Sequence, residues 1–235
     1  MEAETPSQWE YVTVKNTRGI GPDVNPKGVD RKGWILTGGI NFYKSPIFCD
    51  YCRILGSEAE DGFNVIRSSF EFKNSEFASV TSDAFDGDFV KGIVETSSFH
   101  DIAGDAIDVS GSKVRVRNVA LFNIGDKAIS AGEGSQLEAT DITAIDSGIG
   151  VASKDLSQVK LNRALIENAK HAGLAAYEKK PEFGPGDIEA SNIDFKNTTK
   201  NTLVQTESWI ELDGDKIEGT EVDVKAMYEA GILGN

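Results

Sequence analysis

The sequence of 235 residues lacks the features that mark several common protein classes. No apolar run approaches the roughly 18 residues that a membrane-spanning helix needs, so we expect no such helix. The first residues, MEAETPSQWE, are acidic and polar, and no secretory signal peptide is visible in them. No G-x-S-x-G or Walker sequence is present, so the motifs of α/β-hydrolases and P-loop NTPases are missing.

Cysteine and histidine are scarce, with two residues of each. Cys49 and Cys52 form a lone C-x-x-C within IFCDYCRI, a segment with the pattern of a strand. Such a pair could be redox-active, half of a zinc site or a local disulfide. Because no second cysteine pair or neighbouring histidine accompanies it, we interpret both as ordinary thiols. His100 and His171 do not align with each other, and we expect surface or corner positions for both.

Positive charge is in deficit, since 24 Lys and Arg stand against 38 Asp and Glu and give a net charge of -14. Nucleic acids need a basic footprint, so we expect no nucleic-acid partner. The acidic balance suits a cationic ligand, bound metal ions or simple solubility. Hydrophobic residues make up 39% of the chain and charged residues 26%, which is typical of a folded globular domain.

A repeat of about 22 residues is the strongest positive feature of the sequence. Its clearest apolar column is Phe63, Phe85, Ile107, Ile129 and Val151. Short segments of alternating hydrophobicity, such as KVRVRNV, are separated by Gly, Asp, Asn or Ser and indicate strands. No coil contains a helical pattern of about ten residues or more. The repeat therefore predicts an all-β solenoid, a parallel β-helix.

We expect one domain over residues 1–235, with about seven coils of 22–23 residues inside 37–209. The predicted coils are 47–69, 70–91, 92–113, 114–135, 136–157, 158–186 and 187–209. Residues 1–36, with Trp9 and Trp34, would form an N-terminal cap that begins with a strand. Residues 210–235 would form a C-terminal cap with a short helix that stops near Gly231. The insertion EKKPEFGPG, 178–186, predicts a loop beside a binding face.

Particular motifs extend this prediction to a family. They are GWILTGGINFYKSP (33–46), AEDGFNVIRSSF (59–70), SDAFDGDFVKG (82–92), GDAIDVSGS (104–112), GDKAISAGEGS (125–135), GVASKDLS (150–157) and AAYEKKPEFGPG (175–186). Together they closely resemble the right-handed parallel β-helix repeat domain of uncharacterised bacterial proteins, often found beside CotH-like kinase domains. The resemblance implies a right-handed fold and a bacterial, extracellular or cell-envelope setting. It implies no established activity, and the site motifs of polygalacturonases and alginate epimerases are not matched.

Acidic residues recur at the same period and form a ladder. The three columns are Asp61, Asp83, Asp105 and Lys127; Asn64, Asp86, Asp108 and Ser130; and Asp88 with Ser110. Coils stack about 4.8 Å apart, where two carboxylates repel by about 1 kcal/mol in water and more within a protein. Compensation could come from Lys91, Lys127 or Arg67, from a bridging Ca²⁺, or from a proton held on one acid. The corner acids could instead bond local backbone N–H groups.

The same face continues through Glu133, Lys154 and Asp155 towards Tyr177 and the inserted loop. A face of mixed charge with an aromatic residue suits a hydroxyl-rich ligand, although surface ion pairing is an alternative. We therefore predict a carbohydrate-binding or carbohydrate-processing module of a bacterial surface or secreted system. The candidate catalytic residues are Asp83, Asp86, Asp105 and Asp108, with Asp86 and Asp108 as the acid/base pair of a hydrolase-like or lyase-like enzyme. The candidate ligand-binding residues are Asp88, Lys91, Lys127, Glu133, Lys154, Asp155, Tyr177 and Lys179, and Ca²⁺ would bind Asp86, Asp88 and Asp108.

A second hypothesis makes the solenoid a non-catalytic scaffold or docking surface beside another domain, stabilised by Ca²⁺. We expect a monomer rather than an oligomer under either hypothesis. An ice-binding or surface-binding role is disfavoured, because no outward array of threonine recurs at 22 residues.

Overall fold

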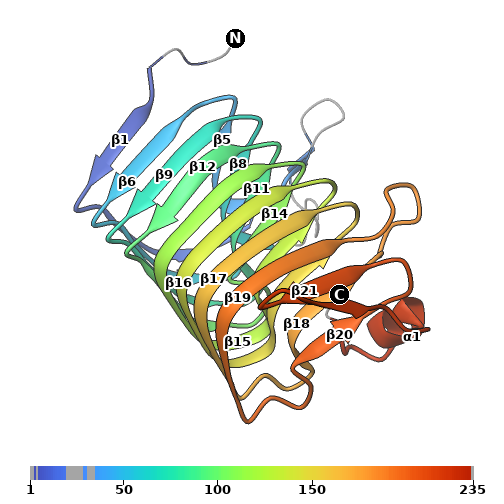
Figure 1. Cartoon of the computed structure of the whole chain (residues 1–235). Coiled ribbons are helices and arrows are strands. Elements are labelled where there is room, and N and C mark those ends of the chain that lie inside the picture. Colours follow the sequence, from blue (N-terminus) through green and yellow to red (C-terminus); the bar gives the residue numbers. More distant parts are fainter. Residues whose placement is uncertain (1–2, 4, 20–28, 31–34, 234–235) are drawn as a thin grey trace.

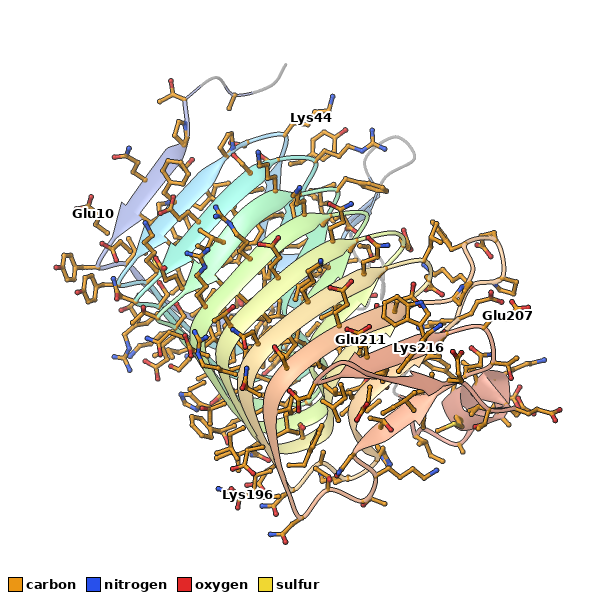
Figure 2. All side chains as sticks on the ribbon, in the orientation of Figure 1. Glu10, Lys44, Lys196, Glu207, Glu211 and Lys216 are labelled. Atoms are coloured by element: carbon orange, nitrogen blue, oxygen red, sulfur yellow. The ribbon has the colours of Figure 1, made fainter. Side chains whose placement is uncertain are left out.

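The computed structural model describes residue 3 and residues 5–19, 29–30 and 35–233. These residues form a parallel β-solenoid of about eight turns with one short helix near the C-terminus (Figure 1). The predicted fold class is confirmed. Charged side chains such as Glu10, Lys196 and Glu211 project outward from the coils (Figure 2). No helix of the described residues is long and apolar enough to cross a membrane.

Each coil contributes strands to three parallel stacks. The first stack contains β1 (Ser7–Glu10), β6 (Ile47–Asp50), β9 (Ser69–Lys73) and β12 (Lys91–Glu95). The second contains β2 (Thr13–Thr17), β7 (Arg53–Ser57), β10 (Glu76–Val80) and β13 (Ser98–Ile102). The third contains β5 (Gly38–Tyr43), β8 (Asp61–Ile66), β11 (Asp83–Asp88), β14 (Ile107–Ser110), β18 (Ala172–Tyr177) and β20 (Thr202–Val204).

Longer strands pass from one stack to the next without a break. β15 (Lys113–Gly132) and β16 (Gln136–Lys154) run through all three stacks. β17 (Gln158–Glu167) and β19 (Asp187–Lys196) run through the first and second. At the corner between these two stacks the backbone takes a positive φ, and Asn74, Asn118 and Asp141 occupy that position in three of the coils. Asparagine and aspartate tolerate this left-handed region better than most residues.

The predicted apolar columns form the core. Phe63, Phe85, Ile107, Ile129 and Val151 are paired in register along the third stack, and each is fully buried. Aromatic rings fill the upper coils; those of Phe77 and Phe99, for example, stack with their centroids 4.6 Å apart. Cys49 and Cys52 are free and buried in the same core. The 22-residue period therefore brings like residues into contact, as predicted.

The solenoid begins earlier than the predicted boundary at residue 37. β1, β2 and β5 pair in parallel with β6, β7 and β8, so the N-terminal segment supplies strands of a further coil rather than a separate cap. β3 (Val29–Asp30) and β4 (Ile35–Leu36) form a small antiparallel pair. The remainder of the predicted cap, 20–28 and 31–34 with Trp34, lies outside the described residues.

The C-terminal segment covers two different surfaces. β21 (Trp209–Leu212) turns back into the antiparallel β22 (Asp215–Glu218), and this hairpin closes the last coil. The predicted helix is present as α1 (Val224–Glu229), where the Asp223 side chain accepts from the Ala226 N–H. α1 lies against β18 and β20 instead of capping the end (Figure 1). The reason is that the outward face is apolar there, with Ala152, Ala175 and Leu203.

Candidate functional site

The candidate site lies on the outward face of the third stack, above the part that α1 covers. Asn64, Asp86, Asp108 and Ser130 occupy successive coils in register, which confirms the predicted alignment of this column. The face changes from acidic side chains in β11 and β14 to alanine at Ala152. The polar and the apolar halves of one face are therefore directly adjacent.

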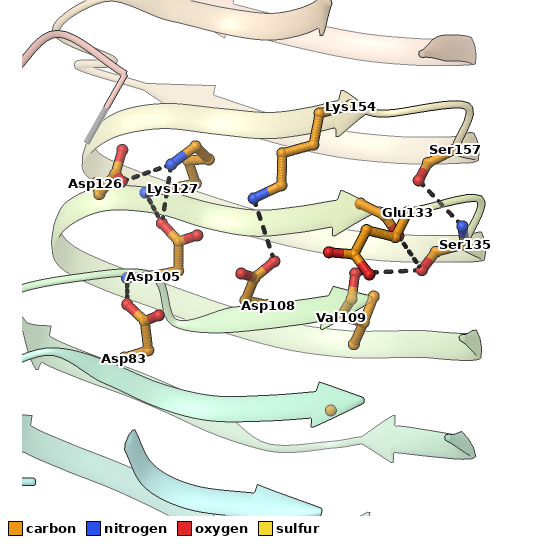
Figure 3. Close-up of polar contacts among 12 residues, drawn as sticks. Asp83, Asp105, Asp108, Val109, Asp126, Lys127, Glu133, Ser135, Lys154 and Ser157 are labelled. Carbon is orange, nitrogen blue, oxygen red and sulfur yellow. Dashed lines mark hydrogen bonds and ion pairs between the residues drawn. The ribbon is translucent and has the colours of Figure 1, made fainter. Parts of the chain in front are cut away.

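The acids at the edge of this stack form hydrogen bonds with neighbouring coils. Asp83 Oδ1 accepts from the Asp105 N–H at 2.7 Å, and Asp105 Oδ1 accepts from the Lys127 N–H at 2.8 Å. Figure 3 shows the two bonds one above the other. These contacts match the backbone-bonding alternative considered for the corner acids. They also fix the orientation of each carboxyl group. Within the described part of the chain, Asp83 accepts a hydrogen bond through Oδ1 alone.

Two buried lysines compensate the negative charge of the ladder. Lys127 Nζ lies 2.5 Å from Asp126 Oδ2 and 3.4 Å from Asp105 Oδ1, and its side chain is 3% exposed. Lys154 Nζ lies 3.6 Å from Asp108 Oδ1, and Lys154 is 7% exposed. Lys154 reaches Asp108 from two coils away (Figure 3). Buried ammonium groups require such partners, because an unpaired buried charge is strongly unfavourable.

The environments of Asp83 and Asp108 drive their pKa values apart. Burial, together with the charges of Asp105 and Asp108, raises the pKa of Asp83 to about 8. Burial, the largest single influence, opposes ionisation of Asp108, but the ammonium of Lys154, the Ser130 hydroxyl and the ammonium groups of Lys127 and Lys179 together outweigh it, and the pKa of Asp108 is lowered. Asp105 lies between them, and burial raises its pKa to about 6. At neutral pH the site therefore holds a protonated carboxyl group close to an ionised one.

A polar cavity of about 440 Å³ opens at these residues. Asp83, Asp105 and Asp108 line it together with Lys127 and Lys154. The opposite wall includes Gly231 and Ile232, which follow α1, and Lys179 of the inserted loop. This volume falls within the usual range of small-ligand sites, about 300 to 1,000 Å³. The C-terminal segment thus turns an exposed ladder into a concave site.

The inserted loop is held beside the cavity by a buried carboxylate. Asp155, which is 1% exposed, accepts from the backbone N–H groups of Lys179 and Lys180, each at 2.7 Å. Lys180 in turn forms an ion pair with Glu133. Asp155 and Glu133, both predicted as ligand-binding residues, therefore have contacts that position the loop.

Other predicted site residues lie outside the cavity lining. Asp86 Oδ2 accepts from Asn64 Nδ2 at 2.8 Å, and burial raises the pKa values of Asp86 and Asp88. Tyr177 is fully buried, and its hydroxyl lies 2.9 Å from that of Tyr228 on α1. Lys91 belongs to the first stack, on a different face. The structure thus places Lys91 on a different face from the acids, and α1 covers Tyr177.

An acidic trio within the site could hold a metal ion. One carboxylate oxygen each from Asp83, Asp105 and Asp108 lies within 4.8 Å of the other two. The metal set predicted from the sequence was Asp86, Asp88 and Asp108, so only Asp108 is common to both. Carboxylate oxygens suit Ca²⁺, but Lys127 and Lys154 already supply positive charge to this trio.

Sequence reasoning missed Asp126, His171 and the segment after α1 as parts of the site. Asp126 precedes Lys127 and has no acidic equivalent one coil earlier, where Gly104 stands. His171 lines the cavity, although its isolated position in the repeat indicated a surface or corner role. Gly231 and Ile232 lie in the non-repeating tail, so no column could place them.

The comparisons with known proteins concern the fold. The family model described as a right handed beta helix region matches residues 61–217. The chain belongs to this family. No curated protein matches the chain. Among solved structures it is similar to the catalytic domain of a GH87 alpha-1,3-glucanase variant in complex with tetrasaccharides, at 9% identity and a TM-score of 0.26. That match covers 93% of this chain and 63% of the other.

Membership of the family supports the right-handed coil predicted from the motifs. The chain spans less than two thirds of the length of that glucanase domain. The bacterial setting and the neighbouring kinase domain, which were expected from the motifs, remain predictions.

Proposed function

We propose that this β-helix binds a carbohydrate in the polar cavity and cleaves a glycosidic bond there. The supporting observation is the pair formed by Asp83, whose pKa is raised to about 8, and Asp108, whose pKa is lowered. Two carboxyl groups held in opposite protonation states are what general acid–base cleavage of a glycoside requires. A bacterial surface or secreted setting, expected from the motifs, is part of this proposal.

In this mechanism Asp83 is the general acid. Its Oδ1 accepts from the Asp105 N–H, so Oδ2 is available to carry the proton that passes to the glycosidic oxygen. The Asp108 carboxylate either activates a water molecule or attacks the sugar carbon, and Lys154 keeps it ionised. The pair Asp86 and Asp108 was predicted from the sequence. We now favour Asp83 over Asp86, because Asp83 lines the cavity with Asp108.

Turnover of polysaccharides tests this proposal. Purified protein is incubated with a panel of neutral and acidic polysaccharides, and new reducing ends are measured together with unsaturated products. We expect one polysaccharide to be cleaved, with a loss of at least about a hundredfold on Asp108→Asn or Asp83→Asn. Asp141→Asn, at an exposed corner where Asp141 pairs with Arg163, is the matched control and should retain full turnover.

The outcome can refute the assignment. Unchanged turnover by Asp108→Asn would remove Asp108 from the mechanism. Because Asp83 acts in its protonated form, activity should fall as the pH rises through about 8. An activity that continues to increase above that pH would exclude Asp83 as the acid.

The acidic trio favours a second candidate function, a Ca²⁺-stabilised scaffold beside another domain. Under this alternative, Ca²⁺ raises the melting temperature, EDTA reverses the effect, and no polysaccharide is cleaved. Cleavage that is unaffected by EDTA would favour the first proposal instead.

A further inference from the structure

A second concave surface lies on the first stack, on a different face from the cavity. Its outward column consists of Phe48, Glu71, Ile93, Arg115 and Glu138, which are paired in register. These residues line a groove of about 640 Å³. Because five successive coils contribute, the groove extends for about 19 Å along the solenoid axis at a coil spacing of about 4.8 Å. An elongated groove of this kind fits an extended polymer better than a compact ligand.

Three cations line the middle of this groove, and two acids, Glu71 and Glu138, line it as well. Lys91 and Lys113 are adjacent in register, and Arg115 follows on the same strand. All three are exposed, and none forms an ion pair within the described part of the chain. Two neighbouring ammonium groups at this spacing repel by about 1 kcal/mol in water. The cluster therefore does not stabilise the fold through charge.

Several other basic residues of the solenoid are paired. Lys160 Nζ lies 2.9 Å from Glu189 Oε2 further along the same stack. Arg53 Nε lies 2.6 Å from Glu76 Oε2 on the second stack. In a chain of net charge -14, unpaired cations concentrated in one groove indicate a site for an anionic ligand.

The remainder of the groove supplies contacts that suit a sugar polymer. Phe48 is 37% exposed and offers a ring face at one end. Ser69 and Gln136 offer a hydroxyl and an amide along the groove.

We propose that this groove binds an extended polysaccharide that carries carboxylate groups. The carboxylates would contact Lys91, Lys113 and Arg115, and the hydroxyl groups would contact the polar rim. A peptide strand is disfavoured, because β12 already pairs with β9 and with β15 on its two sides and presents no open sheet edge. Nucleic acid is disfavoured by the overall negative charge.

This inference is independent of the proposed cleavage, since the groove and the cavity share no residue. The binding proposal and the cleavage proposal can therefore be refuted separately. Binding is measured in the Asp108→Asn background, so that cleavage of the probe cannot obscure it. The probes are polygalacturonate, the neutral polymer dextran and polyglutamate, each titrated against the protein by calorimetry.

The decisive variant is Lys113→Gln/Arg115→Gln. We expect it to weaken polygalacturonate binding by about tenfold or more, since two charge contacts are lost. The matched control, Arg53→Gln/Lys160→Gln, removes the same charge from paired positions and should bind within about twofold of the parent. Binding should weaken between about 50 and about 300 mM salt, and dextran should not bind.

Four results would overturn the proposal. Equal loss in the control and test variants would show a response to net charge alone. Unchanged affinity in Lys113→Gln/Arg115→Gln would show that the ligand binds elsewhere on the protein. Absence of binding to polygalacturonate would refute the proposed ligand class. Stronger binding of polyglutamate would identify the groove as a site for an acidic protein segment. Melting curves of both variants confirm that the folded state is retained.

Discussion

Replacing Asp83 with asparagine should change how stability depends on pH. Asp83 has a folded-state pKa of about 8 against an ordinary value of 3.8. The folded chain therefore binds a proton that the unfolded chain has lost, and stability falls as the pH rises through this window. Asp83→Asn keeps an oxygen that can accept from the Asp105 N–H but has no proton to lose. The variant should therefore become more stable relative to the wild type as the pH increases.

The size of the stability change follows from the pH range between the folded-state and unfolded-state pKa values of Asp83. Each pH unit between the two pKa values corresponds to about 1.4 kcal/mol. Between about pH 5 and about pH 7, a span of two units, the advantage of Asp83→Asn should grow by up to about 3 kcal/mol. The coupled charges of Asp105 and Asp108 make this an upper limit, because they can adjust their own protonation as Asp83 ionises.

Urea unfolding at the two pH values measures this difference directly. The control is Asp141→Asn, because Arg163 lowers the pKa of Asp141 below its ordinary value. Asp141 is therefore ionised at both pH values in the folded and the unfolded chain, and the relative stability of this variant should not change between them. A relative stability of Asp83→Asn that stays constant between the two pH values, or declines towards the higher one, would refute the proposed protonation of Asp83.

Two further predictions concern the surroundings of the cavity. Lys154→Met leaves the Asp108 carboxylate without its buried cation and should destabilise the fold by about 3 to 5 kcal/mol near neutral pH; urea unfolding measures this, and Lys154→Met/Asp108→Leu should recover part of the loss. Asp155→Ala removes the acceptor of two loop N–H groups, so trypsin should cut after Lys179 faster than in the wild type. An unchanged cleavage rate would show that Asp155 does not hold the loop.

The sequence predicted which residues share a column of the solenoid, because each coil packs its inward side chains on the next coil in the same way. Phe85 and Ile107 had to point inward, and the register of Asp86 with Asp108 followed from them. This reasoning needs only a constant period and the alternation of side chains along a strand. It placed the predicted acids on one face, and three of them, Asp83, Asp105 and Asp108, line the cavity.

Contacts outside the repeat could not be predicted in the same way. Lys154 lies two coils from Asp108, and the length and direction of its side chain decide that they meet. Tyr177 belonged to the correct face, but the non-repeating helix α1 covers it and Tyr228 contacts its hydroxyl. The start of the solenoid was also missed, because β1 and β2 pair with the coils although their sequences do not match the repeat.

The wall formed by Gly231 and Ile232 has a consequence for synthesis of the chain. Within the solenoid, neighbouring coils are about 22 residues apart, so each can pack on the previous one as it leaves the ribosome. The cavity is different, because Asp83 and Ile232 line it together and almost the whole repeat separates them in sequence. A growing chain therefore exposes its acidic ladder to solvent until the segment around Ile232 has been made. The cavity is completed only when that segment folds back across the ladder.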